Sequence, residues 1–137
     1  LSVRIKKHSE NALQIAEWLE SQEAVAWVNY PGLKSSKYHE LSKKYLKNGQ
    51  SGIVTFGLKK GFEGGKKLTD STKIFSLLAN FGDSKSLIIH PASTTHQQLS
   101  EKEQEKTGVT ADLIRLSIGL EDPADLINDL SESMKRV

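Results

Sequence analysis

The chain has 137 residues and a mass of 15.2 kDa, which is the size of one domain. Nineteen basic and seventeen acidic residues give a formal net charge of +2, and with 36% hydrophobic residues the composition excludes an intrinsically disordered chain. No apolar run reaches the length of a membrane span, and the absence of cysteine excludes disulfides, thiolate metal sites and a cysteine nucleophile. The first residue is leucine and the first segment already has the pattern of a helix interior, so we expect a piece of a longer protein.

The first 50 residues predict two helices separated by a strand. Apolar residues at steps of three and four predict an amphipathic helix whose inward face comprises Leu1, Ile5, His8, Ala12, Ile15 and Leu19. A short strand over residues 24–28 follows, and it stops at the turn Tyr30-Pro31-Gly32. Ser36 is a suitable N-cap for a second helix that ends near Asn48-Gly49. Its predicted inward-facing residues are Tyr38, Leu41 and Tyr45.

The middle of the chain predicts strands around one helix. Residues 52–58 alternate in the manner of a strand, with Val54, Phe56 and Leu58 on one face. A third helix, loosened at its start by glycines, should run to about Ser71. The apolar runs 74–79 and 86–90 have the length of strands, and the Asn, Gly and Asp between them argue against one continuous helix.

The last third predicts an ordered loop, two helices and the clearest strand. Residues 91–99 form the loop, and Ser100-Glu101-Lys102-Glu103 is a capping-box sequence that begins a short charged helix. Residues 113–118 form the strand, and Asp122-Pro123 begins the last helix. Four or five strands with about five helices favour an α/β (α+β) architecture, a sheet covered by helices.

Arg115 is the residue with the most distinctive environment, since it interrupts a strand that is otherwise apolar. Strand alternation places Leu113, Arg115 and Ser117 on one face and Ile114, Leu116 and Ile118 on the other. A guanidinium keeps its charge, and its planar fork suits a carboxylate bound through two hydrogen bonds. Arg115 is therefore a candidate for anion binding. An internal ion pair with Asp or Glu, or a side chain reaching solvent from an edge strand, stays open as an alternative.

The other polar residues give weaker indications. His90 and His96 flank a loop of hydroxyl residues, for which hydrogen bonding within the loop is favoured over a metal site or a Ser–His pair. His8 falls on an apolar stripe and is expected to be packed, and His39 is expected to be exposed. The glycines at 61, 64 and 65 lack the Gly-Lys-Ser/Thr of a phosphate loop. The dispersed lysine pairs favour solvated helix faces over a nucleic-acid surface.

Three segments carry a family resemblance. Residues 75–83 are FSLLANFGD, residues 86–96 are SLIIHPASTTH, and residues 113–122 are LIRLSIGLED. In this order and spacing they resemble the C-terminal domain of the Cys/Met-metabolism family of pyridoxal phosphate (PLP) enzymes, a family that includes cystathionine synthases and lyases and methionine γ-lyase. With residues 26–31 upstream, they are most similar to the O-acetylhomoserine sulfhydrylase branch. The resemblance covers about residues 1–135.

The resemblance implies that residues 1–137 are the small C-terminal domain of a fold-type-I PLP enzyme, without its large catalytic domain. Arg115 would bind the α-carboxylate of the amino-acid substrate. Asn80, which stands where other branches usually have serine, the backbone N–H of Phe81, and Thr95 would complete the substrate site. The family lysine that binds PLP lies in a Ser-x-Thr-Lys setting of the large domain. Asp70-Ser71-Thr72-Lys73 is expected to be a helix end, so no catalytic, cofactor-binding or metal-binding residue is expected in this chain.

The activity implied by the resemblance is a PLP-dependent transfer reaction. Sulfide or a thiol would replace the acetyl group of O-acetylhomoserine and give homocysteine or methionine, in a cytoplasmic enzyme that assembles as a homotetramer. The chain alone is expected to be inactive, and neither nucleic acid nor membrane is an expected partner. Another branch of the family, or an independent module that captures anions through Arg115, stays open as an alternative.

Overall fold

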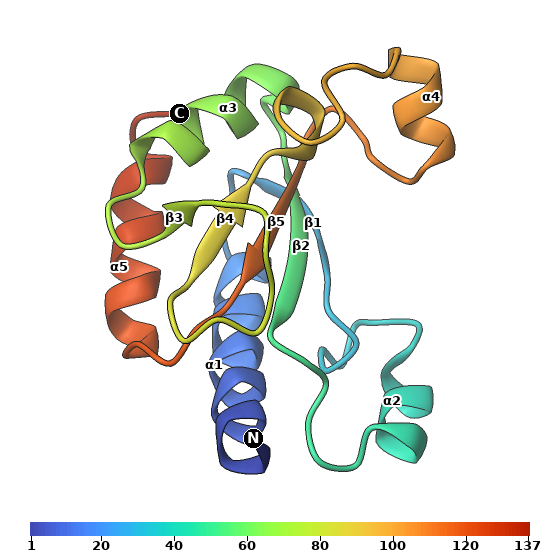
Figure 1. Cartoon of the computed structure of the whole chain (residues 1–137), viewed down its shortest axis with the longest axis vertical. Helices are drawn as coiled ribbons and strands as arrows, with labels where there is room; N and C mark the ends of the chain where they lie inside the picture. Colours follow the sequence, from blue (N-terminus) through green and yellow to red (C-terminus); the bar gives the residue numbers. More distant parts are fainter.

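The chain folds into a sheet with helices against one of its faces, as Figure 1 shows for a computed structural model that describes residues 1–137. In chain order the elements are α1 (Ser2–Glu20), β1 (Val25–Asn29), α2 (His39–Tyr45), β2 (Ile53–Leu58), α3 (Gly61–Ser71), β3 (Ser76–Leu77), β4 (Leu87–Ile89), the 3-10 turn η1 (Pro91–Ser93), α4 (Glu101–Lys106), β5 (Leu113–Ser117) and α5 (Pro123–Met134). No helix among them is both long and apolar enough to cross a membrane.

The five strands form one mixed sheet in the order β1-β2-β5-β4-β3. All neighbours are antiparallel except β3 and β4, which are parallel. The strand β5 lies in the middle, and its register places Arg115 opposite Thr55 of β2 and opposite Ile89 of β4. Residues paired across neighbouring strands share a face of the sheet, so these three side chains lie in one row.

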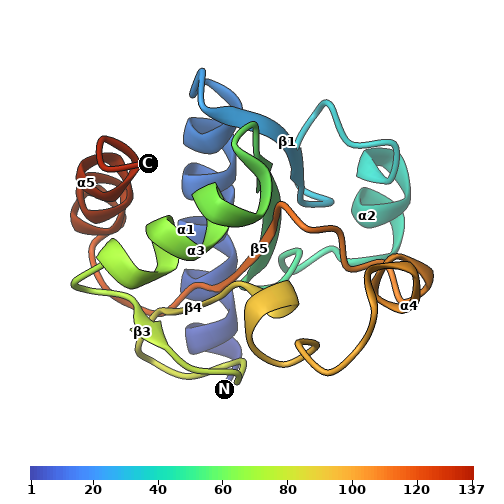
Figure 2. The same ribbon diagram turned by 90° about the horizontal axis from the view of Figure 1, so that it is seen from above.

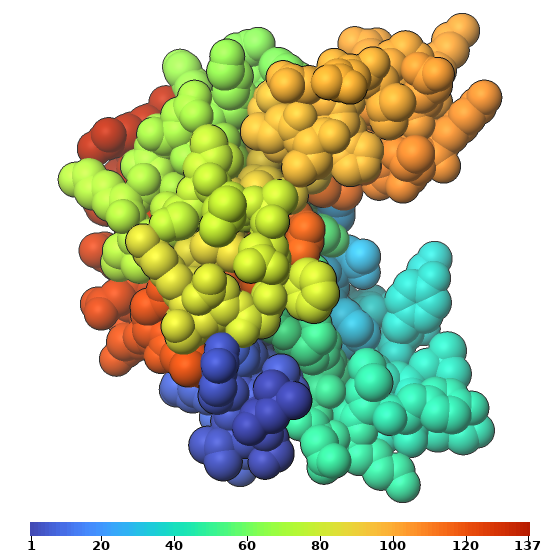
Figure 3. Space-filling view, in the orientation of Figure 1, coloured from blue at the N-terminus to red at the C-terminus, as the bar shows by residue number.

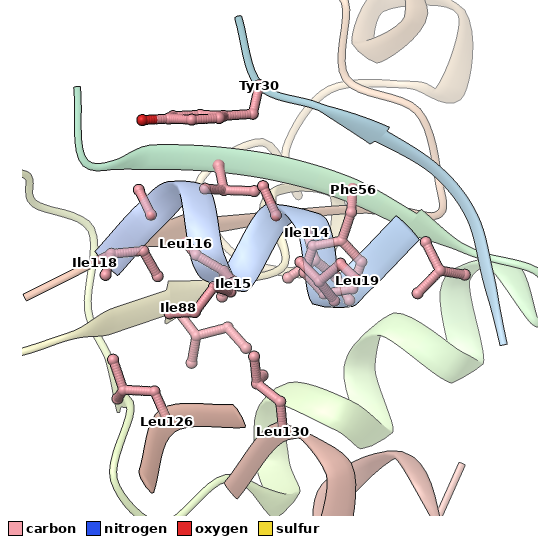
Figure 4. Packing of buried hydrophobic residues seen from close by; sticks show 14 of the residues in the cluster. Ile15, Leu19, Tyr30, Phe56, Ile88, Ile114, Leu116, Ile118, Leu126 and Leu130 are labelled. Carbon is pink, nitrogen blue, oxygen red and sulfur yellow. The ribbon is translucent and has the colours of Figure 1, made fainter. Parts of the chain in front are cut away.

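The hydrophobic core lies between the sheet and the helices α1, α3 and α5. The sheet contributes Val54, Phe56, Leu58, Ile88, Ile114 and Leu116, and the helices contribute Ala12, Ile15, Leu19, Leu68, Leu126 and Leu130 (Figure 4). Every second residue of β2 and β5 faces this core, which confirms the alternation predicted from the sequence. The face of β5 that carries Arg115 is therefore the face without these helices.

The second face of the sheet is open over its centre. Viewed from above, α1, α3 and α5 lie on one side of the sheet, while α2 and α4 project toward the other side (Figure 2). In the space-filling view the surface is hollowed between the cyan residues of α2 and the orange residues of α4 (Figure 3). The fold thus presents the Arg115 face of the sheet between two short helices.

Most predicted elements are confirmed within one or two residues. The helices α1 and α3, the strands β2 and β5, and the turn that Pro91 begins all lie where the sequence places them. The capping box of α4 is present, and the Asp122 side chain accepts a hydrogen bond from the backbone N–H of Ala124 at the start of α5. These signals are local, so they are legible before the tertiary fold is known.

The predicted inward face of α1 is confirmed from His8 to Leu19 and wrong at its start, and that of α2 is wrong throughout. Leu1 and Ile5 are 92% and 40% exposed, because the first turns of α1 extend beyond the end of the sheet (Figure 1). The three predicted apolar contacts of α2, Tyr38, Leu41 and Tyr45, are also exposed. The buried residue of α2 is instead Ser42, whose Oγ donates to the carbonyl oxygens of Pro31 and His39.

The predicted strand over residues 74–79 is shortened to Ser76–Leu77. Before it, the backbone N–H groups of Lys73, Ile74 and Phe75 donate to the carboxylate of Asp129 on α5 and not to another strand. After it, the chain leaves the sheet edge and forms a loop over residues 78–85. This loop reaches Arg115.

Candidate anion-binding site

Arg115 is half-buried in the middle of the sheet, on its open face. The backbone of Arg115 is fixed because its strand, β5, pairs with β2 on one side and with β4 on the other. Its guanidinium Nη2 donates to the backbone carbonyl oxygen of Asn80 at 3.3 Å. The charged group is therefore held over the sheet by a neutral acceptor.

No carboxylate neutralises Arg115. The ion pairs of the chain lie on exposed helix surfaces and join Lys6 to Glu10, Lys43 to Glu40, and Lys135 to Glu132. The internal ion pair that the sequence left open is thus absent. With only the Asn80 carbonyl as a partner inside the chain, the guanidinium retains N–H donors for an anion that approaches the open face.

Asn80 and Phe81 lie in the loop that meets Arg115. Both residues are exposed, and the Asn80 side-chain Oδ1 accepts a hydrogen bond from the backbone N–H of Phe81 at 2.9 Å. The Phe81 N–H, which the resemblance assigns to a substrate carboxylate, already has a partner in this conformation. The amide Nδ2 of Asn80 makes no hydrogen bond within the chain, so this residue retains a side-chain donor.

Thr95 is the predicted site residue that comes from the other loop next to β4. It is exposed and follows η1, beyond the end of β4 opposite to the Asn80 loop, and its Oγ1 lies 2.8 Å from the Nδ1 of His96. No hydrogen bond joins it to the other predicted site residues. A hydrogen bond therefore joins Arg115 to the Asn80 loop, and the place of Thr95 in the same site stays a prediction.

The histidines are structural, with one difference from expectation. His90 is buried and its ring nitrogens lie 2.8 Å from Ser93 Oγ and from the Ala111 carbonyl oxygen, so the predicted hydrogen-bonded loop is confirmed. His8 is packed as predicted, with Nδ1 2.6 Å from the Ile118 carbonyl oxygen. His39 is half-buried, not exposed. No group of three or more His, Asp or Glu residues comes together in a way that could hold a metal ion.

The segment Asp70-Ser71-Thr72-Lys73 is a helix end, as expected. The helix α3 ends at Ser71, and Thr72 is its C-cap. Lys73 is exposed and lies next to α5, because its backbone N–H donates to Asp129. Lys73 thus lies at the β3 edge of the sheet beside α5, which packs on the covered face, whereas Arg115 lies on the open face of the central strand.

Sequence reasoning missed two carboxylates that hold the Asn80 loop. Asp129 binds the backbone just before β3, and Glu121 binds the backbone and side chain of Ser86 just before β4. Asp129 did carry a signal, because a charged residue directly beside the apolar stripe of a helix needs a partner when it is buried. Glu121 lies next to a helix start and carried no comparable signal.

One hollow of the chain lies away from Arg115. It measures about 940 Å³ and lies between the start of α1 and the turn at residues 47–50, where Leu1, Val3 and Ile5 contribute exposed apolar surface. Arg115 thus stands on an open sheet face and not inside that hollow.

Comparisons with known proteins give a consistent result. The family model described as Cys/Met metabolism PLP-dependent enzyme matches residues 1–135. The chain is 51% identical to O-acetyl-L-homoserine sulfhydrylase of Leptospira meyeri, covering 100% of this chain and 31% of that protein. It is 46% identical to the homocysteine/cysteine synthase of Saccharomyces cerevisiae, covering 100% of this chain and 33% of that protein.

A solved structure is also similar. It is a crystal structure from Campylobacter jejuni, described as an O-acetylhomoserine (thiol)-lyase with N'-pyridoxyl-lysine-5'-monophosphate. Its TM-score is 0.89 and its sequence is 54% identical, over 97% of this chain and 32% of that one. The chain spans about a third of the length of the curated relatives it matches.

Proposed function

Because the chain belongs to the Cys/Met-metabolism family of PLP-dependent enzymes, we propose that it is the small domain of an O-acetylhomoserine sulfhydrylase. In this proposal residues 1–137 form that domain and Arg115 binds the α-carboxylate of the substrate. The parent enzyme replaces the acetyl group of O-acetylhomoserine with sulfide or a thiol, giving homocysteine or methionine. The observation that carries the role of this domain is the Arg115 guanidinium, which faces the open side of the sheet without a carboxylate partner.

The chemistry of Arg115 matches this role. A guanidinium does not lose its proton in proteins, so its charge is available at every pH at which the enzyme folds. A planar fork that accepts a carboxylate through two parallel hydrogen bonds also fixes the orientation of the amino acid. Asn80 contacts the guanidinium through its backbone carbonyl and retains its Nδ2 as a neutral donor, and we assign Asn80 to carboxylate binding as well. Thr95 and Phe81 remain in the proposed substrate site, at its edge.

PLP, the cofactor of the family, supplies an electron sink for the reacting carbon when it is bound. The residues of this chain do not fit PLP by themselves. Lys73, whose sequence setting most resembles that of the family lysine, lies beside α5 on the covered side of the sheet, away from Arg115. We therefore place the PLP-binding lysine and the phosphate-binding groups in the part of the parent enzyme outside this chain. For that parent we propose a cytoplasmic homotetramer, on the basis of the family resemblance.

The test of the role of Arg115 is Arg115→Ala in the full-length enzyme. We expect kcat/KM for O-acetylhomoserine to fall roughly thirtyfold or more. This corresponds to a loss of about 2 kcal/mol of transition-state stabilisation, because a charged hydrogen-bonded pair is lost. The matched control is Arg136→Ala, which removes an exposed arginine near the end of α5. An Arg115→Ala enzyme with unchanged kcat/KM would remove Arg115 from the site, and a wild-type enzyme that prefers cystathionine or methionine would indicate another branch of the family.

A further inference from the structure

The loop over residues 78–85 has little apolar packing to hold it in place. Leu78 and Phe81 are 53% and 72% exposed, and Asn80 is exposed as well. The loop nevertheless provides the acceptor for Arg115, through the carbonyl oxygen of Asn80. Polar contacts therefore set its position: the Arg4 guanidinium donates to the Gly82 carbonyl oxygen at 2.9 Å within the loop, and further hydrogen bonds hold the end where the chain returns to the sheet.

Glu121 makes the contacts at the end of the loop nearest β4. Its Oε1 accepts a hydrogen bond from the Ser86 backbone N–H at 2.7 Å, and its Oε2 accepts one from the Ser86 hydroxyl at 2.8 Å. The same hydroxyl oxygen accepts the backbone N–H of Gly119 at 2.8 Å. Ser86 is fully buried, and each of its polar groups has a partner. Hydrogen bonds to an ionised carboxylate are stronger than neutral ones, and Glu121 accepts two of them, so it is a firm attachment of this end of the loop.

The attachment leads directly to the strand of Arg115. Gly119 follows β5 by two residues, and a Cβ there would lie 2.3 Å from the Ser84 carbonyl oxygen and 2.4 Å from Glu121 Oε2. The backbone N–H of Leu120 donates to the same Ser84 carbonyl at 2.8 Å. The segment after β5 and the end of the loop therefore touch without a side chain between them. Glu121 joins the strand that holds the guanidinium to the loop that receives it.

We propose that Glu121 is a positioning residue for substrate binding, acting through the loop on Arg115; this inference rests on the proposed function. With the carboxylate intact, the Asn80 carbonyl holds the guanidinium in one orientation before the substrate arrives. Without the Glu121 carboxylate, the Ser86 N–H and hydroxyl lose their acceptors and the loop loses this attachment. The guanidinium then gains orientations in which it does not bind the carboxylate of the substrate. A preorganised group binds more tightly because less freedom is lost on binding, so the effect belongs to substrate binding.

The experiment is Glu121→Gln in the full-length, PLP-loaded enzyme. We expect KM for O-acetylhomoserine to rise about tenfold, with kcat per bound PLP changed by less than about twofold, since a misplaced binding group weakens binding without touching the reacting atoms. Hydrogen exchange of the backbone amides over residues 78–86 should become faster. The matched control is Glu132→Gln, which removes an exposed α5 carboxylate paired with Lys135 and should change neither quantity.

A double-variant cycle separates positioning from loss of stability. If Glu121 acts through Arg115, adding Glu121→Gln to Arg115→Lys should raise KM no further, because the oriented fork is already gone. Ser86→Ala, which removes only the hydroxyl contact, should give a smaller rise in KM and keeps the test available if Glu121→Gln folds poorly.

The outcomes for the two proposals are distinct. An unchanged KM in Glu121→Gln, or a further rise in the Arg115→Lys background equal to that in wild type, would overturn the positioning role and leave the proposed function standing. An Arg115→Ala enzyme with normal kcat/KM would instead remove Arg115 from the proposed substrate site, and a full-length wild-type enzyme with no activity on O-acetylhomoserine would overturn the proposed function. Loop exchange in Glu121→Gln would then decide by itself whether Glu121 holds the segment.

Discussion

Tyr30 shows how one buried hydroxyl stabilises a strained turn. Its ring lies in the core (Figure 4), and its OH donates to the Ser51 carbonyl oxygen at 2.9 Å and lies 3.2 Å from that of Ser9. Ser51 has a φ of +84°, a conformation that residues with a side chain rarely adopt. Burial raises the pKa of Tyr30 well above its usual value of 10.0, so the hydroxyl stays protonated in the folded state.

At this scale we predict that Tyr30→Phe lowers the free energy of unfolding by about 1–2 kcal/mol at neutral pH, because the Ser51 carbonyl loses its partner. Above pH 10 the unfolded tyrosine ionises while the folded one does not, so wild-type stability falls as pH rises. The difference between the two proteins should therefore shrink at alkaline pH. Urea unfolding between pH 7 and pH 11 measures it, and a constant difference would contradict the assignment.

At the scale of elements, α5 positions β3 through a single side chain. The Asp129 carboxylate accepts hydrogen bonds from the backbone N–H groups of Lys73, Ile74 and Phe75, at 2.8 to 3.3 Å. These groups precede a two-residue edge strand that cannot hold itself to the sheet by its own ladder. Glu121, just before α5, binds the other end of the same excursion at Ser86. The helix and its N-terminal flank thus fix both ends of the Asn80 loop.

We predict that Asp129→Asn lowers the free energy of unfolding by about 1–3 kcal/mol. An amide has one acceptor oxygen for the three backbone N–H groups, which now donate to the two oxygens of the carboxylate. The exposed Asp125→Asn on the same helix is the control and should have little effect. Denaturant unfolding of both variants tests this. Equal stability of Asp129→Asn and wild type would show that the three N–H groups find other partners.

At the scale of the whole molecule, the two faces of the sheet have opposite roles. The covered face contains the hydrophobic cluster, to which α1, α3 and α5 all contribute from within the chain. The open face carries the unneutralised Arg115, and apolar side chains are also exposed on α2 and on the loop over residues 78–85. The chain therefore supplies all the residues of its hydrophobic core, whereas the face that carries Arg115 stays open.

From this division we predict that the isolated chain unfolds cooperatively but has no sulfhydrylase activity. It should also lack the visible absorbance of lysine-bound PLP after incubation with the cofactor, because the proposed cofactor groups lie outside it. Circular dichroism during heating and an absorbance spectrum after dialysis are sufficient measurements. A stable lysine-bound chromophore in the isolated chain would show that the proposed division of the site is wrong.

Local patterns in the sequence determined most of the elements and the face on which Arg115 lies. A period of two placed Ile114 and Leu116 opposite Arg115, and Asp122-Pro123 marked the start of α5, because both signals depend only on neighbours along the chain. The same reasoning failed for α2, since a seven-residue helix can show an apolar stripe without any surface to cover it.

Only the tertiary structure decided which groups meet Arg115. Whether an acid neutralises the guanidinium, and which carboxylates hold its loop, depends on the order and register of the strands. Ser86 and Glu121 are 35 residues apart and Lys73 and Asp129 are 56 apart, and no periodicity reports such pairs. The sheet order β1-β2-β5-β4-β3 places Arg115 beside the loop over residues 78–85. Packing of α5 against the sheet brings Asp129, and Glu121 just before the helix, to the two ends of that loop. The strand order and the helix packing are determined by burial of the apolar face of the sheet, which depends on residues from the whole chain.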